Sequence, residues 1–256
     1  MLDTITATWP EVEAAIQRGC IAILAVGAQE QHGPHCPLST DTIMAAGLAR
    51  RLAERLDALL LPPIPYGEAW NNSRFPGTIT ISFATLKALI DDIILSLQRS
   101  GVRALVVVNG HYGNRAPIEI AFQEALTRSG DQPFPLLMLN YPGMERLAGQ
   151  ICESKPTAYS FFHADEFETS IVLALQPEAV QMDKARPSYP VFPPTFGSEP
   201  VYLDSFNPSG VFGDPRSATA AKGELLLSGL VEECLKIIEP FLEINHGGTE
   251  HTEKGI

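Results

Sequence analysis

Near its N-terminus the chain reads Ile21-Ala22-Ile23-Leu24-Ala25-Val26-Gly27-Ala28-Gln29-Glu30-Gln31-His32-Gly33-Pro34-His35-Cys36-Pro37-Leu38-Ser39-Thr40-Asp41. The first six residues form a short, apolar, partly β-branched run, which predicts a buried strand that ends in a Gly/Pro-rich loop. In extended backbone Glu30 and His32 project to the same side, and turns at the prolines would let Asp41 fold back to meet them. Carboxylates and imidazoles that converge in this way suit a divalent transition metal. The stretch therefore predicts a strand with a metal site at its end.

Two residues of this loop have a second interpretation. Asp41 begins an apolar pattern of helical spacing and could cap that helix, a role that does not exclude metal ligation. Cys36 could be a ligand or a small apolar filler, because free cysteines often behave as buried hydrophobes. A loop of solvated charges is the general alternative for any one of these residues, and their combination favours the metal site.

The composition excludes several classes of protein. The 256 residues suffice for one large domain with a core, 45% of them are hydrophobic, and no apolar run is long enough to cross a membrane. A formal net charge of −12 without a basic cluster argues against nucleic-acid and anionic-membrane partners. The four widely spaced cysteines indicate reduced thiols, and no signal peptide is evident. We expect a soluble, cytoplasmic protein that acts on a small molecule.

Apolar periodicity predicts alternating strands and helices along the chain. We expect helices over residues 9–19, 42–56, 83–100, 117–129 and 218–242, and strands at 21–26, 58–61, 104–108 and 135–140. A further helix after residue 160 would place His163, Glu166 and Ser170 on one face. This order predicts an α/β fold, a three-layer α/β/α sandwich around a mostly parallel sheet. It would form one domain over residues 1–244, followed by a polar, flexible tail at 245–256.

The strand at 104–108 repeats the pattern of the first strand. It ends in Asn109-Gly110-His111-Tyr112-Gly113-Asn114, again a Gly-rich turn with a histidine. Ligands in α/β folds bind at the carboxyl ends of strands, so both loops are expected at one site. The long loop at 62–78 is rich in aromatic and Asn side chains, which favours contact with a substrate over disorder. The candidate substrate-binding residues are Trp70, Asn72, Tyr112 and Asn114.

The candidate donor groups exceed what one tetrahedral ion with an open position can use. Two ions bridged by one carboxylate would use them all. The candidate metal ligands are Glu30, His32, Asp41, His111 and Glu166, with His163 and His35 nearby.

Five motifs, in order, resemble those of the creatininase family of amidohydrolases. They are Gly27-Ala28-Gln29-Glu30-Gln31-His32-Gly33-Pro34-His35 with Asp41, Phe75-Pro76-Gly77-Thr78, Asn109-Gly110-His111-Tyr112-Gly113-Asn114, His163-Ala164-Asp165-Glu166 with Glu168-Thr169-Ser170, and Ser209-Gly210-Val211-Phe212-Gly213. The resemblance implies an α/β/α sandwich, two divalent ions with zinc first and manganese or iron as alternatives, hydrolysis of a cyclic or linear amide, and a homo-oligomer, often a hexamer. It also implies that Glu30, Asp41 and His111 hold one ion, while His32, Asp41 and a further carboxylate hold the other.

Departures from the motifs of creatininase itself bear on the second ion and on the substrate. Gly113 stands where creatininase has a glutamate, so the further carboxylate is expected from Glu166, with contributions of Asp165 or Glu168 left open. Phe162 stands where creatininase has a glutamate before the histidine of the fourth motif. Creatinine is therefore not the expected substrate.

The donor set and the resemblance together predict a hydrolase in which a metal-bridging water attacks a carbonyl. His163 would carry the proton to the leaving group, unless it is a core histidine packed beside Phe161 and Phe162. Amide hydrolysis is the first expectation, and the opening of a keto-inositol or similar cyclic ketone by carbon–carbon cleavage is the second. A metal-binding scaffold without catalysis is the alternative that is not an enzyme, and the presence of His163 and all five candidate ligands argues against it.

Overall fold

The computed structural model describes residues 1–130, 133–157 and 161–245. Its centre is a five-stranded sheet in the order β1-β3-β2-β4-β5, and each strand runs parallel to its neighbours. The strands are β1 (Leu2–Asp3), β2 (Ala22–Val26), β3 (Leu59–Leu60), β4 (Leu105–Asn109) and β5 (Leu136–Leu139).

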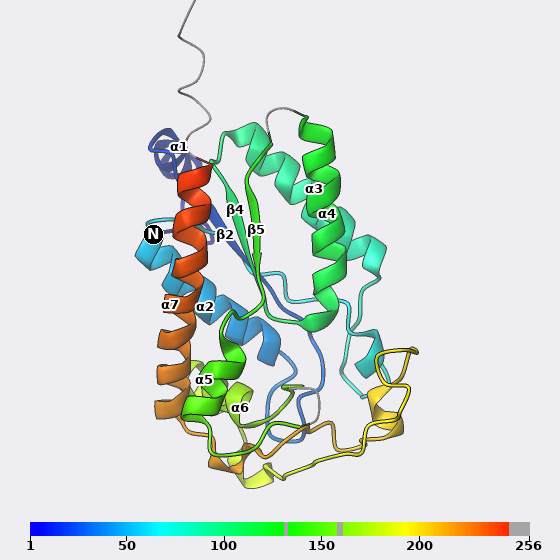
Figure 1. Cartoon of the computed structure of the whole chain (residues 1–256). Coiled ribbons are helices and arrows are strands. Elements are labelled where there is room, and N and C mark those ends of the chain that lie inside the picture. Colours follow the sequence, from blue (N-terminus) through cyan, green and yellow to red (C-terminus); the bar gives the residue numbers. More distant parts are fainter. Residues whose placement is uncertain (131–132, 158–160, 246–256) are drawn as a thin grey trace, which may run out of the picture.

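Helices cover both faces of the sheet (Figure 1). One face carries α2 (Thr40–Leu56), α5 (Met144–Ile151), α6 (Glu166–Leu175) and α7 (Ala220–Ile244), and the other carries α1 (Trp9–Gln17), α3 (Phe83–Ser100) and α4 (Arg115–Ser129). Strand residues alternate between the two hydrophobic clusters, so that Ile23 packs with the first set and Leu24 with the second. The predicted α/β/α sandwich with a parallel sheet is confirmed.

The central strands β2 and β4 are buried along their whole length, which is why each reads as a continuous apolar run. Val26 at the end of β2 pairs with Asn109 at the end of β4. The loops that follow these two strands therefore leave the sheet side by side, as the sequence predicts.

Local signals account for the helix limits that were predicted. Ser82 caps α3 by accepting a hydrogen bond from the backbone N–H of Thr85, and Gly101 ends the helix with φ +82°. Helix α2 begins earlier than expected, because its N-cap is Ser39, and Asp41 lies in its first turn. The strand β1 and the helix α5 were not expected. β1 has only two residues, and α5 has only eight, although its apolar residues Met144, Leu147, Ala148 and Ile151 have helical spacing.

Helix α6 begins later than the sequence suggests. Asp165 is its N-cap and accepts a hydrogen bond from the backbone N–H of Glu168, while Ala164 has φ +52°, outside the helical region. His163 lies before the helix and pairs with Phe212 in an isolated antiparallel bridge. The predicted helical face shared by His163, Glu166 and Ser170 is therefore wrong.

Residues 186–217 are rich in proline and glycine and form an irregular stretch, with short turns at η6 (Leu203–Ser205) and η7 (Pro215–Ser217) (Figure 1). The predicted polar tail lies outside the described residues except for Asn245, and the single domain over 1–244 stays a prediction. Among the residues that the structure describes, no helix combines the length and the apolar character that a membrane span needs.

Candidate metal centre

Buried side chains from four segments converge beyond the ends of β2 and β4. Glu30 and His32 come from the loop after β2, Asp41 from the first turn of α2, His111 from the loop after β4, and Glu168 from the first turn of α6. Together with His163, they form groups of three whose ligand atoms lie within 4.8 Å of one another. The groups are Glu30 with Asp41 and His111, His32 with Asp41 and Glu168, and Glu30 with His32 and His163.

Asp41 belongs to the first two groups through different oxygens. Its Oδ1 lies 3.1 Å from Nε2 of His32, and its Oδ2 lies 3.1 Å from Nδ1 of His111. One carboxylate thus faces two imidazoles, which is the arrangement that a ligand shared by two ions requires.

In the first group the other nitrogen of His111 is already engaged. Its Nε2 lies 2.8 Å from the backbone carbonyl oxygen of Glu68, and its Nδ1 lies 3.2 Å from Oε1 of Glu30. A neutral imidazole that donates one N–H to a carbonyl keeps a lone pair on its second nitrogen. In this structure the carboxylates of Glu30 and Asp41 raise the pKa of His111 well above its usual value, so an ion would bind there by replacing the proton on Nδ1.

The second group repeats this arrangement. Nδ1 of His32 lies 3.1 Å from the backbone carbonyl oxygen of Glu30, and Nε2 faces Asp41 and lies 3.6 Å from Oε2 of Glu168. The Glu168 carboxylate is itself held by a 2.6 Å hydrogen bond from the backbone N–H of Ala164. Each group therefore presents one imidazole and two carboxylates, one of them shared.

The donor atoms fit divalent ions. Among the described residues, Nε2 of His32 and Oδ2 of Asp41 are buried and make no hydrogen bond of good geometry, although each lies 3.1 Å from a side chain of opposite charge type. Buried polar atoms are rarely left unpaired, because an unpaired one costs about 1–3 kcal/mol. Imidazole nitrogen and carboxylate oxygen suit zinc and also manganese or iron.

The protonation of these side chains reflects crowded charge. Burial opposes the charged form of His32, but the carboxylates of Asp41 and Glu168 outweigh it and raise its pKa to about 10. Burial raises the pKa of Glu168 to about 8. Burial also works against ionisation of Glu30, yet His111 keeps the pKa of that carboxyl below its usual value. Metal binding would have to displace the protons that His32 and Glu168 hold.

Glu166, expected as the second-ion carboxylate, does not reach this centre. Its carboxylate accepts hydrogen bonds from the backbone N–H groups of Glu153 and Ser154 and from Nζ of Lys222 at 2.5 Å. Two residues along a helix turn through about 200°, so Glu166 and Glu168 face opposite sides of α6. The expectation for Glu166 is corrected in favour of Glu168.

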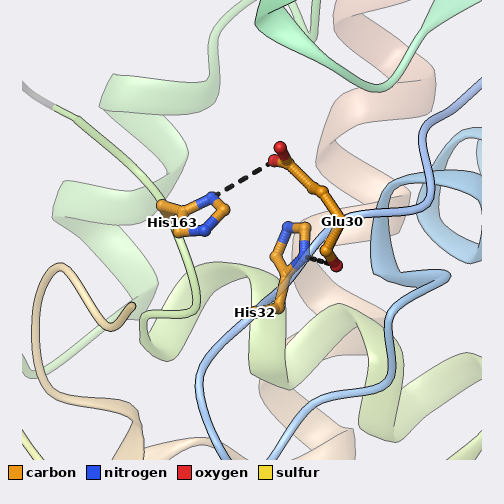
Figure 2. A group of neighbouring side chains, drawn as sticks. All are labelled: Glu30, His32 and His163. Carbon is orange, nitrogen blue, oxygen red and sulfur yellow. Dashed lines mark hydrogen bonds and ion pairs between the residues drawn. The ribbon is translucent and has the colours of Figure 1, made fainter. Parts of the chain in front are cut away.

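His163 lies beside Glu30 and His32 of the centre (Figure 2), and phenylalanine rings also surround it. Its Nδ1 is 3.7 Å from Oε1 of Glu30, and its ring centroid is 4.3 Å from that of His32. Phe161 and Phe212 lie on its other sides, at centroid distances of 6.1 and 5.8 Å. Burial and the nearby His32 lower the pKa of His163 to about 4, which keeps the ring neutral.

Two of the four candidate substrate residues, Asn72 and Asn114, form hydrogen bonds within the protein. Asn72 is 2% exposed, donates to Oε2 of Glu30 and accepts from the side chain of Gln31. Asn114 is fully buried, accepts from the backbone N–H of Glu68 and donates to the carbonyl of Gly27. Both asparagines hold the loops of the centre together, and their expected substrate contacts are corrected accordingly.

The other two candidates remain at the surface. Trp70 is 38% exposed and stacks on Tyr202 with a centroid distance of 4.2 Å. Tyr112, next to His111 in sequence, is 84% exposed. Contact of these two residues with a substrate stays a prediction.

Gly113 has no room for a side chain. A Cβ at this position would lie 2.0 Å from the backbone oxygen of Glu68 and 2.8 Å from Oε2 of the same residue. The space that a glutamate would need is thus filled by the loop before η1 (Trp70–Asn72).

The sequence left Glu168 open as an alternative to Glu166 and indicated no role for Gln31. Glu168 could have been found from the helix start, because Asp165 followed three residues later by a glutamate is an N-terminal pattern that fixes which face each residue takes. Gln31 carried no comparable signal, since its partners come from distant parts of the chain.

The known proteins that are similar to this chain belong largely to one family. A family model described as "Creatininase: Creatinine amidohydrolase" matches residues 6–238. Creatinine amidohydrolase of Pseudomonas putida is 34% identical over 238 residues, covering 88% of this chain and 91% of that protein. Mycofactocin precursor peptide peptidase of Mycolicibacterium smegmatis is 33% identical over 225 residues, which cover 84% of this chain and 82% of that protein.

A third relative, 3-dehydro-scyllo-inosose hydrolase of Thermotoga maritima, is 25% identical over 260 residues, covering 93% of this chain and 83% of that protein. Among solved structures, a creatininase variant of Zn-Zn type is similar with a TM-score of 0.82 and 33% identity over 93% of this chain and 98% of the other. A structure named "Creatininase Mn" is similar with a TM-score of 0.82 and 33% identity, over 94% of this chain and 98% of that chain.

Proposed function

The chain belongs to the creatininase family of metal-dependent hydrolases, and we propose that it hydrolyses a small cyclic or linear amide at a centre of two divalent ions. The position of Asp41 between His32 and His111 is the observation that carries this proposal. Glu30, Asp41 and His111 would hold one ion, and His32, Asp41 and Glu168 the other. Zinc is the first choice and manganese or iron the alternatives, and the existence of zinc and manganese forms of creatininase supports the first two metals.

When bound, the two ions would supply Lewis acidity toward the substrate carbonyl and a shared water whose pKa is lowered to about 7. The chain supplies the rest. Its carboxylates and imidazoles are buried, so bulk water is kept from the donor atoms. His163 is neutral at pH 7 and faces the centre through Nδ1, which is where it would hold a proton for the leaving group.

A substrate panel tests this function. Metal-loaded protein should turn over at least one member of a set of lactams, formamides and short peptides. His163→Asn should keep its metal content and melting temperature while losing roughly 100- to 10,000-fold in turnover, the usual worth of a general acid–base. An amide whose leaving group departs without a proton should suffer less. Equal loss on both kinds of amide, with lost metal, would show that His163 is a ligand or a structural residue.

Creatinine should not be turned over at a useful rate. The chain lacks a carboxylate at Gly113, where a Cβ would strike Glu68, and it has Phe162 before the histidine. Creatinine and a productive amide should be compared in one assay at equal enzyme concentration. Creatinine hydrolysis at a rate comparable to the best amide would contradict this expectation.

Opening of a keto-inositol or similar cyclic ketone is the second candidate. The relative named 3-dehydro-scyllo-inosose hydrolase, similar over 93% of this chain, is the observation that favours it. Hydrolysis of such a ring would release a carbon leaving group in place of an amine, and the proton that this group needs would come from His163. Adding keto-inositols to the panel separates the two candidates. Full metal content without turnover of any compound would favour the scaffold alternative.

A homo-oligomeric assembly, hexameric by family resemblance, and a cytoplasmic location complete the proposal. Light scattering on the purified protein measures the first directly. A monomer at micromolar concentration would contradict it.

A further inference from the structure

Gln31 lies between two candidate metal ligands in sequence, yet its side chain belongs to neither ligand group. It is 6% exposed, and its amide meets four different groups. Oε1 accepts a 2.9 Å hydrogen bond from the backbone N–H of Gly33. Nε2 lies 2.7 Å from Nε2 of His163, 3.0 Å from Oδ1 of Asn72 and 3.2 Å from the carbonyl oxygen of Gly210.

The partners fix the orientation of this amide. A backbone N–H can only donate, so the atom that faces Gly33 is the amide oxygen, and the NH₂ group faces His163. An amide NH₂ group cannot accept a hydrogen bond. Nε2 of His163 must therefore be the acceptor, and in the neutral ring the proton is on Nδ1.

The contacts of Asn72 support the same orientation of the Gln31 amide. The carboxylate of Glu30 can only accept, so the NH₂ group of Asn72 faces Glu30 at 2.8 Å and its oxygen faces Gln31. Gln31 thus donates to Asn72, which in turn donates to Oε2 of Glu30. Nδ1 of His163 faces the other oxygen of Glu30 at 3.7 Å, which is longer than a hydrogen bond.

The absence of a side chain at Gly210 leaves room for the Gln31 amide. Gly210 has φ +69°, and a Cβ there would lie 1.8 Å from Oε1 of Gln31. Two residues later, the backbone N–H of Phe212 donates to the carbonyl oxygen of His163. The segment around Gly210 therefore holds both Gln31 and the backbone of His163.

We propose that Gln31 is a positioning residue that fixes His163 in the tautomer with its proton on Nδ1, directed at Glu30 and the metal centre. The amide N–H occupies the lone pair of Nε2, so the proton that His163 can give lies on the side of the centre. This inference rests on the proposed function only in treating His163 as the proton carrier, because the tautomer is a property of the protein without substrate.

Nitrogen NMR of the histidine side chains in ¹⁵N-labelled, metal-free protein tests the proposal. The His163 signals are assigned by their absence from His163→Asn. In the wild type, Nδ1 should show the shift of a protonated nitrogen and Nε2 that of a nitrogen with a lone pair. Gln31→Glu places an acceptor opposite Nε2 and should move the proton to it. Gln31→Met should abolish the preference, while Gln29→Met, in the same loop without contact to His163, should leave the wild-type spectrum.

Metal content and turnover separate this proposal from the proposed function. Gln31→Met should bind as much metal as the wild type and lose at least 10-fold in turnover of any amide that the wild type hydrolyses. A proton on Nε2 of wild-type His163, or an unchanged tautomer in Gln31→Met and Gln31→Glu, would overturn the proposal even if the protein is an amidohydrolase. The wild-type spectrum decides the matter if the variants do not fold. A protein without turnover but with the proton on Nδ1 would leave Gln31 in its role and remove only the proposed reaction.

Discussion

Glu166 and Glu168 show how two carboxylates of one helix turn acquire different roles. Glu166 is held by Lys222 and two backbone N–H groups, and these donors keep its pKa below the usual range against the effect of burial. Glu168 has one backbone donor and faces His32, and burial raises its pKa to about 8. A spacing of two residues reads as a single acidic cluster in the sequence. The helix start at Asp165 decides which of the two faces the centre.

His35 provides a residue-scale prediction about pH. It is buried, lies 2.9 Å from the hydroxyl of Thr169 through Nε2, and burial lowers its pKa to about 4. An unfolded-state histidine titrates near 6.5, so between pH 6.5 and 4 the unfolded chain binds a proton that the folded chain does not. Stability from this group is fully present above pH 6.5 and is lost as the pH falls through that window.

Urea unfolding of metal-free wild type and His35→Gln at pH 8, 7 and 5 measures this effect. The fall in unfolding free energy from pH 7 to pH 5 should be smaller in His35→Gln by up to roughly 2 kcal/mol. The two proteins should change almost in parallel between pH 8 and 7, where His35 is mostly neutral in both the folded and the unfolded chain. Identical losses from pH 7 to 5 would refute the assignment.

At the scale of elements, the contact between α6 and α7 sets the position of Glu168. Lys222 on α7 reaches Glu166 at the start of α6, and Gly223 lets the two helices approach. A Cβ at Gly223 would lie 1.9 Å from the backbone oxygen of Ser170, so α7 would have to move away. Overpacked sites of this kind cost roughly 1–3 kcal/mol.

Gly223→Ala should therefore lower the unfolding free energy by about that amount. Gly149→Ala is the matched control, because Gly149 also lies in a helix but a Cβ there meets nothing within 4 Å. Alanine at position 149 should be neutral or stabilise by roughly 0.5–1 kcal/mol. Both variants are compared with the wild type in urea. Equal effects of the two substitutions would show that the contact between the helices is looser than described.

Local sequence patterns predicted most of these elements, but not every residue of the centre. Continuous apolar runs identified β2 and β4, and cap signals at Ser82 and Gly101 identified α3, because these features are local. The ligands Glu30, His32, Asp41 and His111 were expected together since parallel strands end at one edge of the sheet. Assigning Glu168 to the centre would have required predicting the first residue of α6 to within one position. The roles of Asn72, Asn114 and Gln31 required partners from distant segments, which no periodicity encodes.

For the whole molecule, the sheet and both helical layers serve to bring four segments to one point. Asp41 arrives from α2 and Glu168 from α6 on one face, while Glu30, His32 and His111 come from the loops after two central strands. None of these segments could hold an ion alone, because each supplies at most two of the five side chains. The proposed centre of two ions is therefore a property of the assembled fold, and Asp41 is the residue on which both ligand groups depend.

Elemental analysis of protein purified without chelator tests this account most directly. We predict close to two transition-metal ions per chain in the wild type, loss of both in Asp41→Ala, and loss of one in Glu168→Gln. Glu166→Gln, a matched change on the opposite side of α6, should keep both. A full complement of metal in Asp41→Ala, or loss of an ion in Glu166→Gln but not in Glu168→Gln, would contradict it.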